Sequence, residues 1–379
     1  MNFGILYGIV LIIFLVIGYL CPNFQKRKYL FISDFVLAIP AYFVRPASYA
    51  TWDTIRFANL LDTMRLFNAS GLANGLKWGL NDTVYSNQPL VVFYIWLMSF
   101  FKNNGIFFYV TILLFLLTLS LLVNESLKKF AVKDNNIGIV IQLFVLMMFN
   151  LFFEVEGVRN FLAFIVFAAF FYIDINSDNR TTKFVCWIAY FIAFSFHPAV
   201  IPFIVFRIII SFKNKLLNFL TKIGAFFYSF FTPLILSLLG SIPFIAPLIT
   251  RSDNYFYGQS NYNSHSTSRE IFFTTLILIY LIIEFALIYL LNISKKLNKS
   301  YIEFYTICLL FTIGSYLNMQ VYLRSIMLLL FLSIPLKVKL FLNKDKFLYL
   351  YWYLSVIMAV ALFVHWYIQT YSLVPSLSF

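Results

Sequence analysis

The stretch IFFYVTILLFLLTLSLLV, residues 106–123, contains no charged residue and is closely followed by Lys128 and Lys129. A membrane-spanning helix needs about 20 predominantly apolar residues, and this run approaches that length. Similar runs recur along the whole chain, in which 62% of the 379 residues are hydrophobic and 11% are charged. The pattern predicts an all-α, polytopic integral membrane protein.

The apolar runs predict about 12 transmembrane helices in a single integral-membrane domain, residues 1–379. The first run has no basic leader, so we expect a retained helix with its N-terminus outside. The spans are expected at roughly residues 3–20, 29–45, 106–123, 137–153, 160–175, 184–196, 199–212, 223–240, 270–292, 301–317, 320–336 and 347–367.

All lysines except Lys77 and Lys102 lie in short links between these runs, at residues 25–28, 128–133, 177–183, 213–222, 294–299 and 337–346. Lysines of this kind gather on the cytoplasmic side. All these links share one side only if the apolar segment near 89–101 does not cross the membrane. We therefore predict a re-entrant or interfacial helix near 89–101, with external loops at 46–88 and 241–269.

The arginines sort differently, because most of them fall on the predicted external side: Arg45, Arg56, Arg65, Arg159, Arg251, Arg269 and Arg324. Since topology does not require them there, they need another reason, and the planar guanidinium suits phosphate and carboxylate ligands. The net charge of +13 is spread as pairs and triplets between apolar runs. It indicates topology and contact with anionic lipid, not nucleic-acid binding.

One charged motif, Glu154-Val-Glu156-Gly157-Val-Arg159-Asn160, joins two apolar runs on the external side. Charges placed in hydrocarbon cost about 2.5–3.5 kcal/mol each, so they usually face a cavity or a partner. We interpret the motif as an anion site, with Arg159 on phosphate and a glutamate near a reacting hydroxyl. A local Glu–Arg pair at the interface is the alternative.

Two further segments end runs on the same side. His197 is followed by Pro198, and histidine exchanges a proton near neutral pH, although an ordinary interfacial histidine looks the same. Arg324 belongs to the segment Asn318-Met-Gln320-Val-Tyr322-Leu-Arg324. We expect Arg324 either to line a polar cavity or to extend outwards to the membrane surface. Motifs for nucleotide hydrolysis and metal-ligand spacings are missing from the sequence, so no cofactor and no metal is predicted.

Inside the spans, Asp34 and Glu284 are isolated carboxyl groups. Intramembrane carboxyl groups occur in proton-coupled transporters, but one isolated group is weak support for that class.

Two motifs follow one another in the middle of the chain: Gly157-Val-Arg159-Asn160-Phe-Leu-Ala163 and, after a basic turn, Phe194-Ser-Phe-His197-Pro-Ala-Val200. Upstream lie Arg45, Trp52-Asp53-Thr54-Ile-Arg56-Phe57 and Asn87-Gln88-Pro89-Leu-Val-Val-Phe93. This order, over roughly residues 1–210, resembles the EpsG-like exopolysaccharide polymerases of the Wzy type. The chain departs from them at Gln88, where an acidic residue is common, at Asn160, which replaces a glutamine, and in lacking a glycine before Asp53.

The resemblance implies polymerisation of polyprenyl-pyrophosphate-linked oligosaccharide repeat units at the external face of a bacterial plasma membrane. Its partners would be that lipid-linked oligosaccharide, membrane lipid, a chain-length regulator and a flippase. The implied catalytic residues are His197, Asp53 and Glu154; the implied substrate-binding residues are Arg45, Arg56, Arg159, Arg324, Glu156, Asn160 and Tyr322. A lipid-linked oligosaccharide flippase and a polyprenyl-phosphate-sugar glycosyltransferase remain alternatives.

Overall fold

The computed structural model describes residues 3–20, 27–46, 53–132, 136–148, 158–231, 268–343, 347–365 and 377–378. Their regular structure is helical apart from one short antiparallel pair. In this pair, β1 (Arg45–Pro46) lies beside β2 (Leu377–Ser378), with Arg45 opposite Ser378. The predicted all-α fold is therefore confirmed for the described part of the chain.

Several helices have the length and composition of membrane spans. Four stretches are long and apolar enough to cross a membrane: Gly105–Lys129 (α6), Val158–Asn176 (α9), Ile271–Leu290 within α15 (Ser268–Leu290), and Met319–Phe341, which comprises α17 (Met319–Leu332) and α18 (Ile334–Phe341). The chain thus has the character of a membrane protein, and the number of 12 spans stays a prediction.

The helix bounds agree with the apolar runs at some places and differ at others. Helix α1 occupies Phe3–Leu20, as predicted, and α10 (Arg180–Phe196) extends four residues further towards the N-terminus than the predicted span 184–196. Helix α12 (Lys215–Phe226) begins inside the predicted link 213–222. It begins there because the Asn214 side chain accepts hydrogen bonds from Leu216 N and Leu217 N, at 3.0 and 3.1 Å, and so caps the helix.

The chain divides into two compact units, which we describe separately. The first contains residues 1–198 and 337–379, and the second contains residues 199–336. The expectation of one integral-membrane domain stays a prediction.

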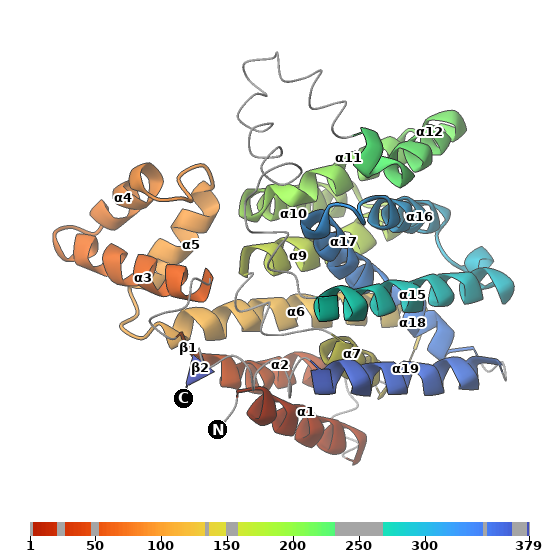
Figure 1. Ribbon diagram of the computed structural model, residues 1–379, viewed down its shortest axis with the longest axis horizontal. Helices are drawn as coiled ribbons and strands as arrows, with labels where there is room; N and C mark the ends of the chain where they lie inside the picture. Colours follow the sequence, from red (N-terminus) through yellow and green to blue (C-terminus); the bar gives the residue numbers. More distant parts are fainter. Residues whose placement is uncertain are drawn as a thin grey trace. The chain divides into compact units, whose positions relative to one another are not determined.

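In the first unit, α6 is the central helix (Figure 1). It packs against α2 (Arg27–Tyr42) on one side and α9 on the other, and α10 packs on α9. Gly105 begins α6 directly against the Tyr42 carbonyl at the end of α2, where a Cβ atom would clash. Helices α1, α7 (Asn136–Met148) and α19 (Phe347–Phe363) complete the bundle. We call the end where α2 and α10 finish and α6 and α9 begin the outer end.

Beyond the outer end lie three short helices, α3 (Asp53–Ala69), α4 (Asn74–Asp82) and α5 (Pro89–Ser99), which pack on one another (Figure 1). The predicted helix near 89–101 is thus present as α5, and its 11 residues are too few for a straight span. Its position in a membrane stays a prediction. The predicted loop 46–88 contains α3 and α4, and the loop 241–269 lies outside the described residues except for the start of α15.

A buried polar contact joins three helices of the first unit. Gln142 Nε2 on α7 donates to Asp34 Oδ1 on α2 at 2.7 Å and to Ser120 Oγ on α6 at 3.1 Å. All three side chains are fully buried. Because water does not reach them, each hydrogen bond is costly to lose, and the contact fixes α2, α6 and α7 together.

In the second unit, α16 (Lys299–Gly314) packs against α11 (Ile201–Ser211), α12 and α17, while α15 packs on α17. Short 3-10 turns lie at Pro198–Val200 (η2) and Ile293–Lys296 (η3). Lys222 Nζ on α12 contacts Glu303 Oε2 on α16 at 2.6 Å. This ion pair joins α12 to the start of α16, near the lysines of η3 and Lys299.

Candidate functional site

Arg159 is the best-defined cation of the predicted site. It is the second residue of α9, a helix of membrane-spanning length, and it is half-buried at the outer end. Its Nη1 donates a hydrogen bond to Gln88 Oε1 at 2.8 Å, and the guanidinium carbon lies 4.4 Å from the centroid of the Tyr85 ring. Both contacts orient the guanidinium through neutral groups, so neither cancels its positive charge.

The position of Arg159 in its helix adds to that charge. The first turn of a helix carries partial positive charge from its backbone N–H groups, which favours anions and disfavours cations. An arginine in this turn therefore raises a potential that is already positive. Such a combination is suited to an anionic ligand, and phosphate groups are commonly bound where backbone N–H groups and arginine converge.

A continuous row of packed rings leads from Arg159 to the end of α10. Tyr85 stacks on Phe57 of α3, with ring centroids 5.6 Å apart, and Phe57 lies 5.4 Å from Phe107 of α6. Tyr94 of α5 lies 5.5 Å from Phe107 and 6.0 Å from Phe196. The row consists of side chains from four helices and the turn before α5, so it fixes the outer end of the first unit.

His197 directly follows Phe196, the last ring of this row. Its backbone N–H donates to the Ala193 carbonyl at 3.0 Å and so caps α10, and its backbone is extended. The side chain is 9% exposed, and Pro198 ends the helix behind it. The structure thus brings Arg159 and His197 to the same end of the first unit, as the sequence predicts.

Helix α3 contains two more of the predicted site residues, Asp53 and Arg56, near this row of rings. Asp53 is its first residue, and its side chain lies outside what the structure describes. Arg56 precedes the buried Phe57 and is exposed. Because Phe57 belongs to the ring row, it holds the start of α3, and with it the Asp53 backbone and Arg56, beside the outer end.

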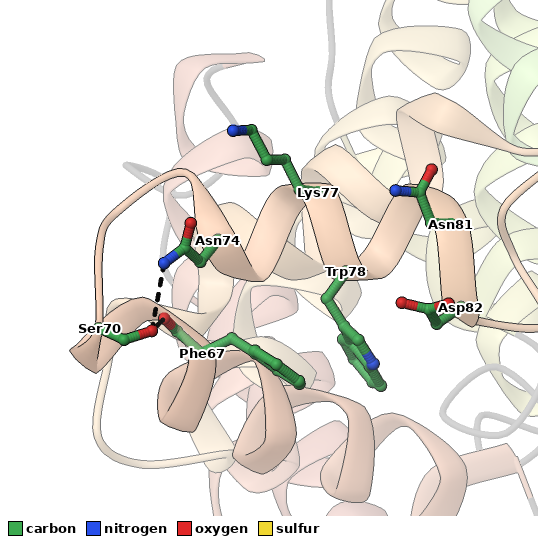
Figure 2. Close-up of a pocket in the computed structure, with 7 residues that line it drawn as sticks. All are labelled: Phe67, Ser70, Asn74, Lys77, Trp78, Asn81 and Asp82. Atoms are coloured by element: carbon green, nitrogen blue, oxygen red, sulfur yellow. Dashed lines mark hydrogen bonds between the residues drawn. The ribbon is translucent and has the colours of Figure 1, made fainter.

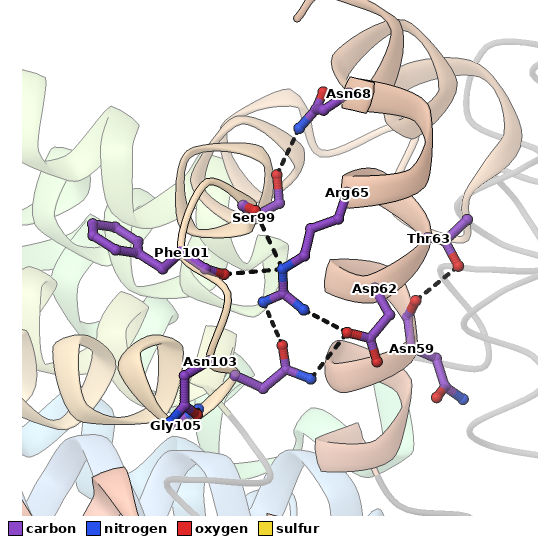
Figure 3. Close-up of polar contacts among 10 residues, drawn as sticks. Asn59, Asp62, Thr63, Arg65, Asn68, Ser99, Phe101, Asn103 and Gly105 are labelled. Atoms are coloured by element: carbon purple, nitrogen blue, oxygen red, sulfur yellow. Dashed lines mark hydrogen bonds and ion pairs between the residues drawn. The ribbon is translucent and has the colours of Figure 1, made fainter. Parts of the chain in front are cut away.

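The contacts of Arg65 on the same helix give it a structural role (Figure 3). Its Nε donates to the carbonyls of Phe101 and Ser99, at 2.9 and 3.3 Å, at the end of α5 and just beyond it, where a helix leaves carbonyls without a partner inside the helix. Its Nη1 contacts Asp62 and its Nη2 contacts Asn104. Arg65 therefore connects α3 to the turn between α5 and α6, and its charge is compensated by Asp62.

Asn160, next to Arg159, is half-buried on α9. Its Oδ1 is buried and accepts no hydrogen bond from the residues that the structure describes. Glu154 and Glu156 lie outside the described residues, and for Arg45 only the backbone in β1 is described. Their predicted roles therefore stay predictions.

Tyr322 and Arg324 belong to the second unit. Tyr322 is fully buried on α17, where its hydroxyl lies 3.3 Å from Thr275 Oγ1 and its ring packs edge-on against Tyr316. Arg324 lies further along α17 and is half-buried. The predicted convergence of Arg324 with Arg159 connects two units that are described separately, and it stays a prediction.

Two residues that hold Arg159 were given no such role by the sequence. The sequence singles out Gln88 only because the similar family commonly has an acidic residue there, and it does not single out Tyr85, although both residues orient the guanidinium. Gln88 lies 71 residues before Arg159, so no local spacing connects them. The one sequence signal that connects Gln88 with Arg159 is that each lies in a segment that resembles the same family.

Comparison of the chain with models of protein families, with curated proteins and with solved structures finds no match in any of the three. The proposal that follows therefore depends on the geometry of the outer end and on the sequence motifs.

Proposed function

We propose that this chain joins lipid-linked oligosaccharide repeat units into a polysaccharide at the outer face of a bacterial plasma membrane. The donor is an oligosaccharide on polyprenyl pyrophosphate, and polyprenyl pyrophosphate is the leaving group. The observation that carries the proposal is Arg159, whose guanidinium lies at the end of an apolar, membrane-length helix and is oriented by Gln88 and Tyr85.

The sorting of charge along the helices supports this orientation in the membrane. Helix α6 begins at the outer end and finishes with Lys128 and Lys129, while α9 begins with Arg159 in its first turn. Lysines at the inner ends of helices follow the positive-inside rule. Arg159 is thus a cation on the side where topology does not require one, and a pyrophosphate headgroup at that level gives it a ligand.

A lipid carrier also needs apolar surface beside the cation. Helix α10, which ends just before His197, exposes a run of large apolar side chains along one side, including Phe184, Ile188 and Phe191. A polyprenyl tail that lies in hydrocarbon along such a surface brings its pyrophosphate to the level of the outer end. The carrier thus suits both the apolar helix surface and the polar end of the unit.

In the proposed reaction, a hydroxyl oxygen of the acceptor sugar attacks the anomeric carbon of the donor. The bond between that carbon and the pyrophosphate oxygen breaks, and its electron pair stays on the pyrophosphate. Arg159 pairs with the pyrophosphate oxygens, whose negative charge grows as the bond breaks. The proton of the hydroxyl passes to His197 or to a carboxylate, Asp53 or Glu154.

The test is to complement a deletion of the gene, in its own host, with Arg159→Ala and His197→Ala and to separate the surface polysaccharide by size. We expect single repeat units in place of a ladder, with protein levels in the membrane unchanged by immunoblot. Lys102→Ala, which removes an exposed cation from the turn between α5 and α6, serves as the control and retains the ladder.

The location of the accumulated material separates the proposal from its main alternative. A polymerase that has lost activity leaves repeat units on the cell surface, whereas an inactive flippase leaves them on the cytoplasmic side. A normal ladder from both alanine variants, or repeat units retained inside the cell, would overturn the proposed function.

A further inference from the structure

A pocket of about 470 Å³ lies between α3 and α4, on the part of α3 that is distant from the ring row (Figure 2). It is an open pocket whose lining consists of two aromatic rings and five polar or charged side chains: Phe67, Ser70, Asn74, Lys77, Trp78, Asn81 and Asp82. The roles assigned so far to the outer end use none of these residues.

The aromatic part of the pocket is a stacked pair. The rings of Phe67 and Trp78 have centroids 5.2 Å apart and planes inclined by 19°. Phe67 is 38% exposed and Trp78 is half-buried, so part of their surface faces the pocket. Large rings that remain exposed beside polar groups offer an apolar contact face, which is a common feature of binding sites.

The pocket is rigidly built, because α4 lies directly against α3 and α5. A Cβ atom at Gly75 would lie 2.9 Å from the Met64 carbonyl of α3, and one at Gly79 would lie 2.6 Å from Val92 Cγ1 of α5. The Gly75 N–H also donates to Asn68 Oδ1 at 3.2 Å. The backbone that carries the lining residues is therefore already ordered before a ligand enters.

The polar residues follow the periodicity of α4. Asn74, Trp78 and Asp82 are spaced four residues apart on one side of the helix, and Lys77 and Asn81 lie on the neighbouring side (Figure 2). Asn74 Nδ2 also donates to Ser70 Oγ at 3.2 Å. The amides both donate and accept hydrogen bonds, the carboxylate accepts, and the ammonium donates.

This combination suits a sugar better than an anion or a lipid tail. A sugar ring presents an apolar C–H face, which packs on an aromatic ring, and a rim of hydroxyls, each of which donates and accepts. Lys77 and Asp82 carry opposite charges, so the lining has no net charge and does not select a phosphate. Its polar groups exclude a purely apolar ligand, since their desolvation would be uncompensated.

We propose that the pocket between α3 and α4 is a saccharide-binding subsite, with Phe67 and Trp78 as its stacking surface and Asn74, Asn81 and Asp82 as its hydroxyl contacts. This inference rests on the proposed function, because it names the growing polysaccharide as the ligand. Phe67 lies ten residues beyond Phe57 on α3, which corresponds to about 15 Å at 1.5 Å per residue. The subsite thus holds the chain several sugars away from the bond that forms.

A distant subsite has a different effect from a catalytic residue. It retains the product after each addition, so its loss lowers the number of additions per binding event and leaves each addition intact. We expect Trp78→Ala and Asp82→Asn to shift the ladder towards short chains, whereas Arg159→Ala leaves single repeat units. The matched control is Phe100→Ala, which removes an exposed ring that packs against Trp96 in α5, outside the pocket.

Binding is measured separately, on the purified full-length protein in detergent, with the surface polysaccharide of the host as the immobilised probe. Wild type, Phe100→Ala and Arg159→Ala should be retained, and both pocket variants should bind about tenfold more weakly, which corresponds to the loss of about 1.4 kcal/mol. Asp82→Asn changes one exposed side chain without changing its size, so its result does not depend on the packing of Trp78.

The inference is overturned if wild type does not bind the polysaccharide, or if both pocket variants bind it as wild type does. The proposed function fails in a different way, namely when Arg159→Ala and His197→Ala both retain a normal ladder. A polysaccharide that binds through Trp78 in a protein whose Arg159 variant still polymerises would support the subsite and reject the assigned chemistry.

Discussion

Arg65 and Arg159 are two arginines from the same part of the first unit, and their surroundings differ in kind. Arg65 contacts a carboxylate, Asp62, and two backbone carbonyls that follow α5. Arg159 is held by the amide of Gln88 and the ring of Tyr85. The contacts of Arg65 include a carboxylate and join elements of the fold, whereas the amide of Gln88 and the ring of Tyr85 orient the Arg159 guanidinium through neutral groups.

The difference shows how a structural arginine is separated from a candidate binding arginine. Composition and sidedness assign both residues to the same external group, because each is an arginine away from the lysine-rich links. Their partners divide that group. A guanidinium that satisfies the carbonyls at a helix end contributes to stability, whereas one oriented by an amide and a ring at the end of a membrane-length helix is a candidate to bind an anionic substrate.

The largest expected effect comes from lysine at position 159. Arg159→Lys keeps a positive charge but loses the planar set of donors that contacts Gln88 and pairs with two phosphate oxygens at once. We expect the polymerisation rate to fall by about 100-fold, the size of effect seen when a transition-state donor is removed. The measurement is the rate of chain extension in proteoliposomes with a synthetic lipid-linked repeat unit.

The same substitution at position 65 is the control for this comparison. Arg65→Lys should extend chains at the wild-type rate for each folded molecule. Equal rates for Arg159→Lys and wild type would remove the distinction between the two arginines.

The next largest effect concerns stability. Arg65→Ala removes the hydrogen bonds to the carbonyls of Ser99 and Phe101 and leaves those groups to find water. Hydrogen bonds to a charged group contribute about 1.5–3 kcal/mol, so we expect the free energy of unfolding to fall by a comparable amount. Thermal unfolding in detergent measures this loss, with Lys102→Ala as the matched loss of a nearby cation. An unchanged unfolding temperature would show that Arg65 does not support α3.

Local patterns predicted the helices well and the contacts between them poorly. The apolar run at residues 3–20 became α1 with those bounds, and Lys128 and Lys129 fall at the end of α6 as the charge pattern indicated. A run of apolar residues reports its own membrane character wherever its neighbours lie. Helices α10 and α12 begin inside predicted links, where the side chains of Asn179 and Asn214 cap them.

The contacts that hold the fold and the candidate site together connect residues far apart in the chain. Arg65 and Asn104 are separated by 39 residues, Gln88 and Arg159 by 71, and Asp34 and Gln142 by 108. From the sequence alone Asp34 is an isolated carboxyl group, and only packing brings Gln142 to it. The pocket between α3 and α4 was missed for the same reason, since Phe67 and Trp78 face one another only after the two helices pack.

The smallest effect tests the role of neutrality at position 88 itself. Gln88→Glu keeps an acceptor for Arg159 Nη1 but adds a negative charge 2.8 Å from the guanidinium. The new carboxylate competes with the pyrophosphate for Arg159, so we expect the KM for the lipid-linked donor to rise by about tenfold with a smaller change in kcat.

Gln88→Leu is the informative comparison, because it removes the hydrogen bond and adds no charge. If Gln88→Glu and Gln88→Leu raise KM equally, Gln88 acts only by orienting Arg159. If Gln88→Glu is the weaker binder of the two, the donor recognises the positive charge of the guanidinium. A KM for Gln88→Glu equal to that of wild type would contradict the assignment of Arg159 to the pyrophosphate.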